Sequence, residues 1–282
     1  MLKKKTLFVI ASVIIAIVAV LTVLVANNRT KQPVVDTKKY LNIDISQFKN
    51  GSDIFITPHE LQQKLGHENI VILDASHPKV YGKGHIPGAV SIGFKGLSNC
   101  MGKPGDKEWG TILPKDRLTK KLESLGIDNN KLVVAYSDIF KGPGGGGRAV
   151  WQMKMAGLDN VRLLYGGLEL WKRCGYELSR EPVIPVCAEN IVLKDYDESF
   201  RANQEYIFKN LDTIKIVDVR SLKEFTGDDT SRGEARGGHI KGSQWLDWTW
   251  LMNKDASVKS PGKIIELMAG IGIKPGDEFV LY

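Results

Sequence analysis

Short, mostly apolar runs recur along the chain and are separated by segments in which apolar residues follow helical spacing. The runs at 70–73, 132–136 and 161–164 have the length and composition of strands that are buried on both faces of a sheet. Strands that alternate with helices predict an α/β fold, in which helices cover both faces of a parallel sheet.

Two segments between these runs carry helix signals. Thr57 precedes Pro58, and a capping residue followed by proline at the first helical position predicts a helix that runs to about Leu65. Apolar spacing predicts a second helix over 148–155.

The same order of elements then restarts. The chain has a strand-like run at 214–219, a helix start at Ser260 and Pro261, and a further strand-like run at 278–282. We therefore expect two α/β domains of the same kind, the second of them incomplete. The expected organisation is a membrane anchor or signal peptide (1–26), a spacer (27–53), a first domain (54–178), a linker (179–200) and a second domain (201–282).

The amino terminus has three lysines followed by the uncharged, apolar residues 6–26. These 21 residues, at about 1.5 Å each, match a hydrocarbon core of roughly 30 Å. An uncleaved anchor is favoured over a signal peptide cleaved after Ala26, because Leu24 is large for the position that it would occupy. We expect both domains outside the cytoplasm, in a single-pass membrane protein or, after cleavage, in a periplasmic or secreted one.

Charge and cysteine content narrow the partners. The chain has 39 Lys and Arg against 32 Asp and Glu, a net charge of +7, which favours anionic small molecules or an anionic membrane surface. It has no basic stripe with interleaved aromatic residues, so we expect no nucleic acid partner. The cysteines are Cys100, Cys174 and Cys187, without a CxxC pair or metal spacing, so we expect neither a disulfide framework nor a metal.

An internal repeat links the two expected domains. The sequence Gly-His-Ile-Pro-Gly-Ala at 84–89 resembles Gly-His-Ile-Lys-Gly-Ser at 238–243. Each follows a strand that ends in an acid, Asp74 or Asp218. A period this long indicates a duplicated domain and excludes a solenoid repeat.

These motifs resemble those of the rhodanese family, the thiosulfate sulfurtransferases. The family pattern has Asp-x-Arg at the end of a strand, then Gly-His-Ile-x-Gly-Ala/Ser, and the second half matches it with Asp218 and Arg220. The first half has no arginine at the matching place after Asp74, but its Gly-Gly-Leu-Glu-Leu-Trp at 166–171 is similar to the family's last signature.

The resemblance implies where the chemistry belongs. In tandem rhodaneses the second domain holds a nucleophilic cysteine directly after its fourth strand, which here places the nucleophile directly after Tyr282. No catalytic residue is then present in the 282 residues, and we expect these residues by themselves to be inactive. The residues expected to support the active site are Asp218, Arg220, Glu224 and His239.

The position of Tyr282 has two interpretations. The sequence is a gene fragment or frameshift product, or the next codon is a UGA that encodes selenocysteine and has been read as a stop. Selenium replaces sulfur at transfer nucleophiles, which motivates the second interpretation.

The corresponding place in the first domain follows 132–136 and contains no cysteine. We expect this domain to be catalytically silent. A glycine run ahead of the helix predicted over 148–155 is either a loop that binds an anion at the helix start or a flexible spacer. The residues of this candidate anion loop are Gly144, Gly145, Gly146, Gly147 and Arg148.

The resemblance implies a sulfurtransferase of thiosulfate or 3-mercaptopyruvate type. It would pass a sulfane sulfur through a persulfide to cyanide or a thiol, without a cofactor. One alternative is a catalytically inactive rhodanese-like module that senses an anion or docks a protein. A rhodanese-like phosphatase would need a longer loop with Cys and Arg beyond Tyr282.

Overall fold

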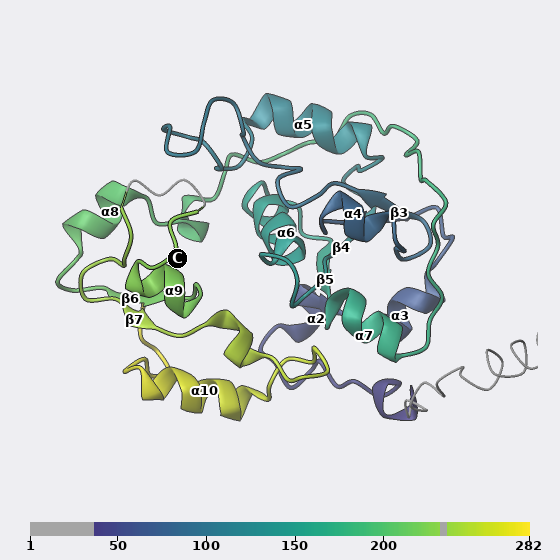
Figure 1. The fold of residues 1–282 in the computed structure, drawn as a ribbon. Helices are drawn as coiled ribbons and strands as arrows, with labels where there is room; N and C mark the ends of the chain where they lie inside the picture. The colour runs from purple at the N-terminus through teal and green to yellow at the C-terminus, as the bar shows by residue number, and fades with distance from the viewer. Residues whose placement is uncertain (1–36, 232–235) are drawn as a thin grey trace, which may run out of the picture. The chain divides into compact units, whose positions relative to one another are not determined.

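The structure, a computed structural model, describes residues 37–231 and 236–282 (Figure 1). These residues form two parallel sheets, of strand order β1-β5-β4-β2-β3 and β7-β6-β8. None of the helices in this part of the chain combines the length and the apolar character that a membrane span requires. The anchor or signal peptide expected at 6–26 lies outside the described residues.

The first sheet has its core on both faces. Leu73 and Val133 pack with helices on one face, while Ile72 and Val134 pack with helices on the other, as the alternation along buried strands requires. Its strands are β1 (Phe55–Ile56), β2 (Ile70–Asp74), β3 (Ala89–Ser91), β4 (Leu132–Tyr136) and β5 (Val161–Leu164).

Helices cover both faces of this sheet. The helices α5 (Lys115–Ser124) and α6 (Gly145–Met155) pack on one face, and α3 (Pro58–Gln63) and α7 (Gly167–Arg173) pack on the other. The shorter α2 (Gly51–Ile54) and α4 (Pro78–Tyr81) complete the unit. The predicted α/β fold with a parallel sheet is confirmed here.

Helix boundaries follow local signals with one exception. Thr57 caps α3 in a reciprocal capping box with Glu60, and the helix ends at Gln63. The helix predicted over 148–155 begins earlier, at Gly145, because Gly144 supplies a left-handed turn (φ 77°) that starts it. A Cβ at Gly145 would clash with the carbonyl oxygen of Ala75, so glycine allows α6 to lie against the chain that follows β2.

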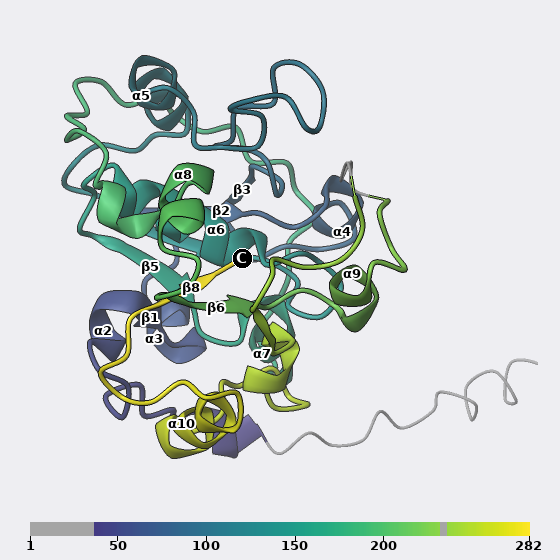
Figure 2. The ribbon, with the colours of Figure 1, turned by 90° about the vertical axis from the view of Figure 1, so that its left-hand side faces the viewer.

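The second sheet repeats part of the first. In β7-β6-β8 the central strand β6 (Lys215–Asp218) pairs with both neighbours, β7 (Gln244–Trp245) and β8 (Phe279–Leu281), as β2 pairs with β3 and β4. Figure 2 shows β8 beside β6, with the end of the chain at the carboxyl end of β8. The helices of this half are α8 (Gln204–Lys209), α9 (Leu222–Thr226) and α10 (Pro261–Gly270), with 3₁₀ turns η2 (Glu198–Phe200) and η3 (Trp248–Leu251).

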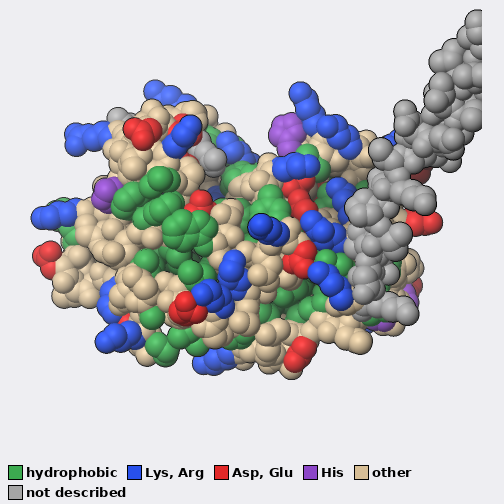
Figure 3. Space-filling model, turned by 60° about the horizontal axis from the view of Figure 1, so that its bottom comes forward, with side chains coloured by type: hydrophobic (Ala, Val, Ile, Leu, Met, Phe, Trp, Pro, Cys, Tyr) green, Lys and Arg blue, Asp and Glu red, His purple; other side chains and the backbone are tan. Residues whose placement is uncertain are grey.

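Two connecting segments pack on the first half. In the described part of the expected spacer, η1 (Thr37–Tyr40) ends in Tyr40, which is buried in a cluster with Tyr165. Within the expected linker, Lys194 donates its backbone N–H to the carbonyl of Ala156. On the face shown in Figure 3, the Lys and Arg side chains of the described residues are dispersed among acidic ones and form no stripe.

Candidate active site

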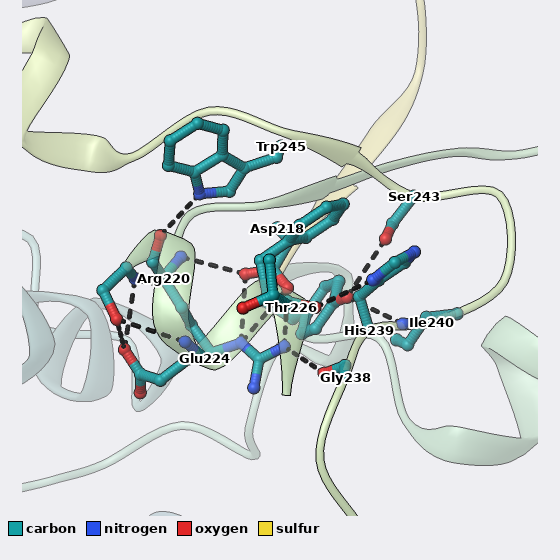
Figure 4. A network of polar contacts seen from close by, with 12 residues as sticks. Asp218, Arg220, Glu224, Thr226, Gly238, His239, Ile240, Ser243 and Trp245 are labelled. Carbon is teal, nitrogen blue, oxygen red and sulfur yellow. Dashed lines mark hydrogen bonds and ion pairs between the residues drawn. The ribbon is translucent and has the colours of Figure 1, made fainter. Parts of the chain in front are cut away.

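A buried acid ends the central strand of the second sheet. Asp218 is fully buried, and the guanidinium of Arg220 donates to both of its oxygens, with distances of 3.0 Å from Nε to Oδ1 and 2.6 Å from one terminal nitrogen to Oδ2 (Figure 4). The backbone N–H of Arg220 also donates to Oδ1. Burial opposes ionisation of Asp218, but these hydrogen bonds outweigh it and hold its pKa below the usual value.

Arg220 is itself fixed from several sides. It donates to the carbonyl of Gly238 at 2.8 Å, and its guanidinium lies 5.1 Å from the ring centroid of Tyr282. The indole N–H of Trp245 donates to the backbone carbonyl of Arg220 at 2.9 Å. The cation therefore has a defined position between the end of β6 and the end of β8.

Tyr282 connects the end of β8 to the Gly-His-Ile turn. Its hydroxyl accepts the backbone N–H of Ile240 at 2.8 Å and lies 3.1 Å from the hydroxyl of Ser243. Its carbonyl accepts the N–H of Val219. A residue attached to Tyr282 in a longer chain would thus begin beside the Asp218–Arg220 pair.

The other two residues expected to support the active site stabilise turns. His239 stacks on Phe225 with ring centroids 3.9 Å apart, and its Nδ1 donates to the carbonyl of Phe225 at 2.9 Å. Glu224 is buried, and its Oε2 accepts both the N–H and the hydroxyl of Ser221 in a capping box that starts α9. These contacts of Glu224 lie within its own helix, so they fix the start of α9 next to the pair.

The first half repeats the stacked histidine and the tyrosine hydrogen bond of the second half, but it has no arginine after its buried acid. Its His85 stacks on Tyr81 at 3.8 Å, and the hydroxyl of Tyr136 accepts the N–H of Ile86 at 3.0 Å. The chain carries Ser76 where the second half has arginine.

Among the described residues, the buried acid of the first half consequently has no cation as a partner. Asp74 is fully buried, and its Oδ1 accepts the backbone N–H of Ser76 at 2.7 Å. Its Oδ2 has no hydrogen-bond partner among the described residues. Burial and the nearby carboxyl of Asp74 raise the pKa of Tyr136, so the tyrosine keeps its proton while its oxygen accepts the N–H of Ile86.

The segment after β4 is held to the first half by side chains. The hydroxyl of Ser76 accepts the N–H of Asp138 at 3.0 Å, and Oε2 of Glu169 accepts the N–H of Ile139 at 2.8 Å. Burial, together with a hydrogen bond to the neighbouring Asp138 carboxyl, raises the pKa of Glu169 to about 7. Two carboxyl groups therefore share the place of an active-site loop, which disfavours an anion there.

The glycine run is helix and not the expected loop or spacer. Gly144 caps α6, and the run that follows, Gly145, Gly146 and Gly147, forms its first turn. Gly145 and Gly146 are buried, and the N–H of Gly146 already donates to the hydroxyl of Ser137 at 3.2 Å. A Cβ at Gly146 would lie 2.9 Å from backbone atoms of Tyr136, so close packing against β4 requires glycine there. This corrects the expectation of a flexible spacer.

Arg148 does not join Gly144, Gly145, Gly146 and Gly147 in one site. Its guanidinium reaches the loop before α5, where Nε donates to the hydroxyl of Ser98 at 3.2 Å and a terminal nitrogen donates to the carbonyl of Gly110. Packing of α6 on the sheet takes up the glycines and directs the arginine to another loop, and anion binding by this segment stays a prediction.

The cysteines lie elsewhere. Cys174 is buried at the end of α7, and burial raises the pKa of its thiol to about 11, which suppresses the nucleophilic thiolate. Cys100 and Cys187 are exposed. Across 37–231 and 236–282, no group of three His, Cys, Asp or Glu side chains is placed to hold a metal ion.

Sequence reasoning missed the tyrosines. Tyr136 and Tyr282 each end the last apolar run before the expected loop, and each hydroxyl accepts the N–H that follows the histidine of a Gly-His-Ile turn. Their equal place in the repeat was the available signal.

This fold and these paired turns define a rhodanese-like α/β protein. The family described as "Rhodanese-like domain" matches residues 57–174, which lie within the first half. A likeness to solved structures supports the same fold. The chain is 22% identical to Escherichia coli SseA, a structure described as the rhodanese fold of 3-mercaptopyruvate sulfotransferases, at a TM-score of 0.68 over 80% of this chain and 87% of that one.

Curated relatives extend the match across both halves. The chain is 29% identical to thiosulfate sulfurtransferase of Azotobacter vinelandii over 231 residues, 81% of this chain and 82% of that protein. A Haloferax volcanii protein named "Putative thiosulfate sulfurtransferase" is 30% identical over 211 residues, 72% of this chain and 70% of that protein. The chain belongs to the rhodanese family of sulfurtransferases.

The same fold also occurs within longer chains. This chain covers 60% of EanB in complex with ergothioneine, at a TM-score of 0.70 and 20% identity. That likeness shows the fold alone.

Proposed function

We propose that this protein transfers a sulfane sulfur from thiosulfate or 3-mercaptopyruvate to cyanide or a thiol acceptor, and that its second half is the catalytic type of a tandem pair. The Asp218–Arg220 pair carries the proposal, because it places a fixed cation at the carboxyl end of β6, beside the end of β8. Both proposed donors are anions, and although Asp218 balances the charge of Arg220, the partly exposed guanidinium can still donate a hydrogen bond to such an anion.

The chemistry needs one nucleophile. A thiolate or selenolate attacks the outer sulfur of thiosulfate, the S–S bond breaks, and sulfite leaves with the bonding electrons. Cyanide or a thiolate then attacks the terminal sulfur of the resulting persulfide-type intermediate and releases the nucleophile as an anion. Backbone N–H groups of a loop at the end of a buried strand would stabilise the anionic forms.

The proposed place of the nucleophile is the position after Tyr282. The hydrogen bonds of Tyr282 with Val219 and Ile240 support it, because they bring the end of β8 to the Asp218–Arg220 pair. In this proposal the nucleophile is a cysteine or a selenocysteine.

A second candidate is a catalytically inactive docking or anion-sensing module. The thiol of Cys174 favours this inactive module for residues 1–282 taken alone. Burial raises its pKa to about 11, so this cysteine supplies little of the thiolate that sulfur transfer needs near neutral pH. The two candidates differ in a single measurable property, turnover.

We also propose that 6–26 anchor the protein in a membrane with both halves outside the cytoplasm, or serve as a cleaved signal. The length and apolar character of this segment support the proposal. Fractionation of cells, with protease added from outside, tests it; a fully protected protein in the soluble cytoplasmic fraction would contradict it.

The first experiment reads the coding DNA across the codon for Tyr282 and assays thiocyanate formation by the product of the whole gene. TGA followed in frame by a loop, a helix and a further strand, with turnover that Arg220→Ala lowers and the exposed control Arg180→Ala does not, supports the sulfurtransferase. A different triplet would reject selenocysteine. A whole gene product that makes no thiocyanate from either donor would leave the docking module.

A further inference from the structure

A pocket of about 800 Å³ lies away from the Asp218–Arg220 pair. Its walls come from the loop 107–112, from Arg148 and Trp151 on α6, and from residues 201–208. The volume falls within the range of about 300–1,000 Å³ that is typical of small-molecule sites. None of the residues placed in the candidate active site of the second half lines it.

The segment that leads into 201–208, one wall of the pocket, is hydrogen-bonded to α6. The indole N–H of Trp151 donates to the carbonyl of Phe200 at 2.8 Å, and the N–H of Asp197 donates to the carbonyl of Met155. The chain that enters 201–208 is therefore bonded to α6 immediately before it forms the wall.

Arg148 gives the pocket its charge. Its side chain is partly buried, held by Ser98 and Gly110, and the guanidinium lies 5.3 Å from the ring centroid of Phe94. Within the described residues no carboxylate lies within ion-pairing distance of it, and burial lowers its pKa. A partly buried cation without a counter-ion gains most from an anion that enters beside it.

The remaining charges in the wall are exposed. Lys107, Glu108 and Glu205 all line the pocket and all face water, so solvent and salt screen them. Arg201, also in the wall, already pairs with Glu198 at 2.9 Å. The two acids disfavour a dianion, whereas one negative charge next to Arg148 is compensated.

Aromatic surface completes the site. The indole N–H of Trp151 donates to the carbonyl of Phe200, and the residue lines the pocket. Phe208 lines the same pocket and is 80% exposed. An exposed phenylalanine beside a partly buried cation suits a ligand with one charge and one apolar ring.

We propose that this pocket binds a small organic monoanion with an aromatic or similarly bulky apolar part, its carboxylate on Arg148 and its ring between Trp151 and Phe208. The site is separate from the proposed sulfur-transfer site and does not depend on it. Bound ligand would also hold 201–208 against α6.

Phenylacetate is the probe, and neutral phenylacetamide is its matched control. Ligand-observed NMR titration of the full chain should show saturable binding of phenylacetate and much weaker binding of the amide. Arg148→Gln should weaken phenylacetate binding at least about tenfold, since it removes a charge-assisted hydrogen bond. Phe208→Ala should weaken it about three- to tenfold through lost apolar contact.

Arg180→Gln is the control variant, because Arg180 also donates to a backbone carbonyl, that of Lys83, but does not line the pocket. It should bind phenylacetate as the unaltered protein does. Should Arg148→Gln fail to fold, the exposed Phe208 and the amide comparison still test the site.

Hydrogen exchange provides an independent reading. Phenylacetate should slow amide exchange in 201–209 and leave 215–218 unchanged. The proposal is overturned if phenylacetate does not bind, or if Arg148→Gln and Arg180→Gln bind it equally. It is also overturned if phenylacetamide binds as tightly as phenylacetate, or if phenylacetate leaves amide exchange in 201–209 unaltered.

Discussion

Asp74 and Asp218 occupy matching places in the two halves, each at the carboxyl end of a strand that has a neighbour on both sides, and each fully buried. In the second half Arg220 donates to both oxygens of the acid, whereas in the first half a serine stands there and one oxygen has no partner among the described residues. The same frame thus carries a charged pair in one half and a neutral hydroxyl in the other.

The difference indicates how the halves have diverged. Ser76 uses its hydroxyl to hold the segment after β4, through the N–H of Asp138, and so closes the place where a loop nucleophile would be expected. Arg220 instead reaches toward Tyr282 and leaves a cation beside the end of β8. Four experiments test this comparison, from the largest expected effect to the smallest.

Arg220→Ala should be the most damaging change. It leaves the buried carboxylate of Asp218 without its ion pair, and removing one partner of such a pair costs about 3–5 kcal/mol. Urea unfolding followed by tryptophan fluorescence measures the loss. The exposed control Arg180→Ala should stay within about 0.5 kcal/mol of the unaltered protein; equal losses for both variants would show that the pair does not brace the site.

Tyr136→Phe should cost more than Tyr282→Phe. The first change leaves the buried N–H of Ile86 without an acceptor, at about 1–3 kcal/mol. Tyr282 is partly exposed, so water can replace its hydroxyl beside Ile240 and we expect a loss below about 1 kcal/mol. Thermal unfolding of both variants checks the order, and a reversed order would mean that the turn of the second half is the less accessible one.

The halves should respond to pH in opposite directions. The pKa of Glu169 is raised from 4.5 to about 7, so the folded first half holds a proton that the unfolded chain releases, and its stability falls as pH rises from about 4.5 to 7. Partial exposure of Glu169 limits the loss to less than about 2 kcal/mol. The pKa of Asp218 is lowered, so the stability that this acid gives the second half is present above the usual value of 3.8 and is lost as pH falls through the folded value.

Unfolding of the first half between about pH 4.5 and 7, with Glu169→Gln as control, measures this slope. The glutamine variant should lose most of it. A slope that Glu169→Gln leaves intact would assign the titration to another group.

Asp74→Asn should have the smallest effect. It keeps the oxygen that accepts the N–H of Ser76 and removes the charge from Oδ2, which has no hydrogen-bond partner in the part of the chain that the structure describes, so we expect a change within about 1 kcal/mol. Asp218→Asn, its counterpart, breaks the ion pair with Arg220 and should be clearly destabilising. Chemical denaturation compares the two, and a large loss for Asp74→Asn would reveal a partner for Oδ2 in solution.

The sequence by itself determined the strands β2, β4, β5, β6 and β8, the capped helix at Thr57, the two Gly-His-Ile turns and the acids at the ends of β2 and β6, but not the short strands β1, β3 and β7. These features depend on side-chain periodicity and on turn chemistry within a few residues, which a single chain displays directly. The family resemblance rested on the same local motifs, and the curated relatives bear it out.

Only the tertiary structure decided which groups meet. The burial of Asp74, the Glu169–Asp138 carboxyl pair and the position of Arg148 on the loop before α5 all depend on contacts between segments far apart in sequence. The glycine run at 144–147 became the cap and first turn of α6 because α6 lies against Ala75 and β4. Burial sets the charge state and the partner of each of these groups, and burial is a property of the folded chain.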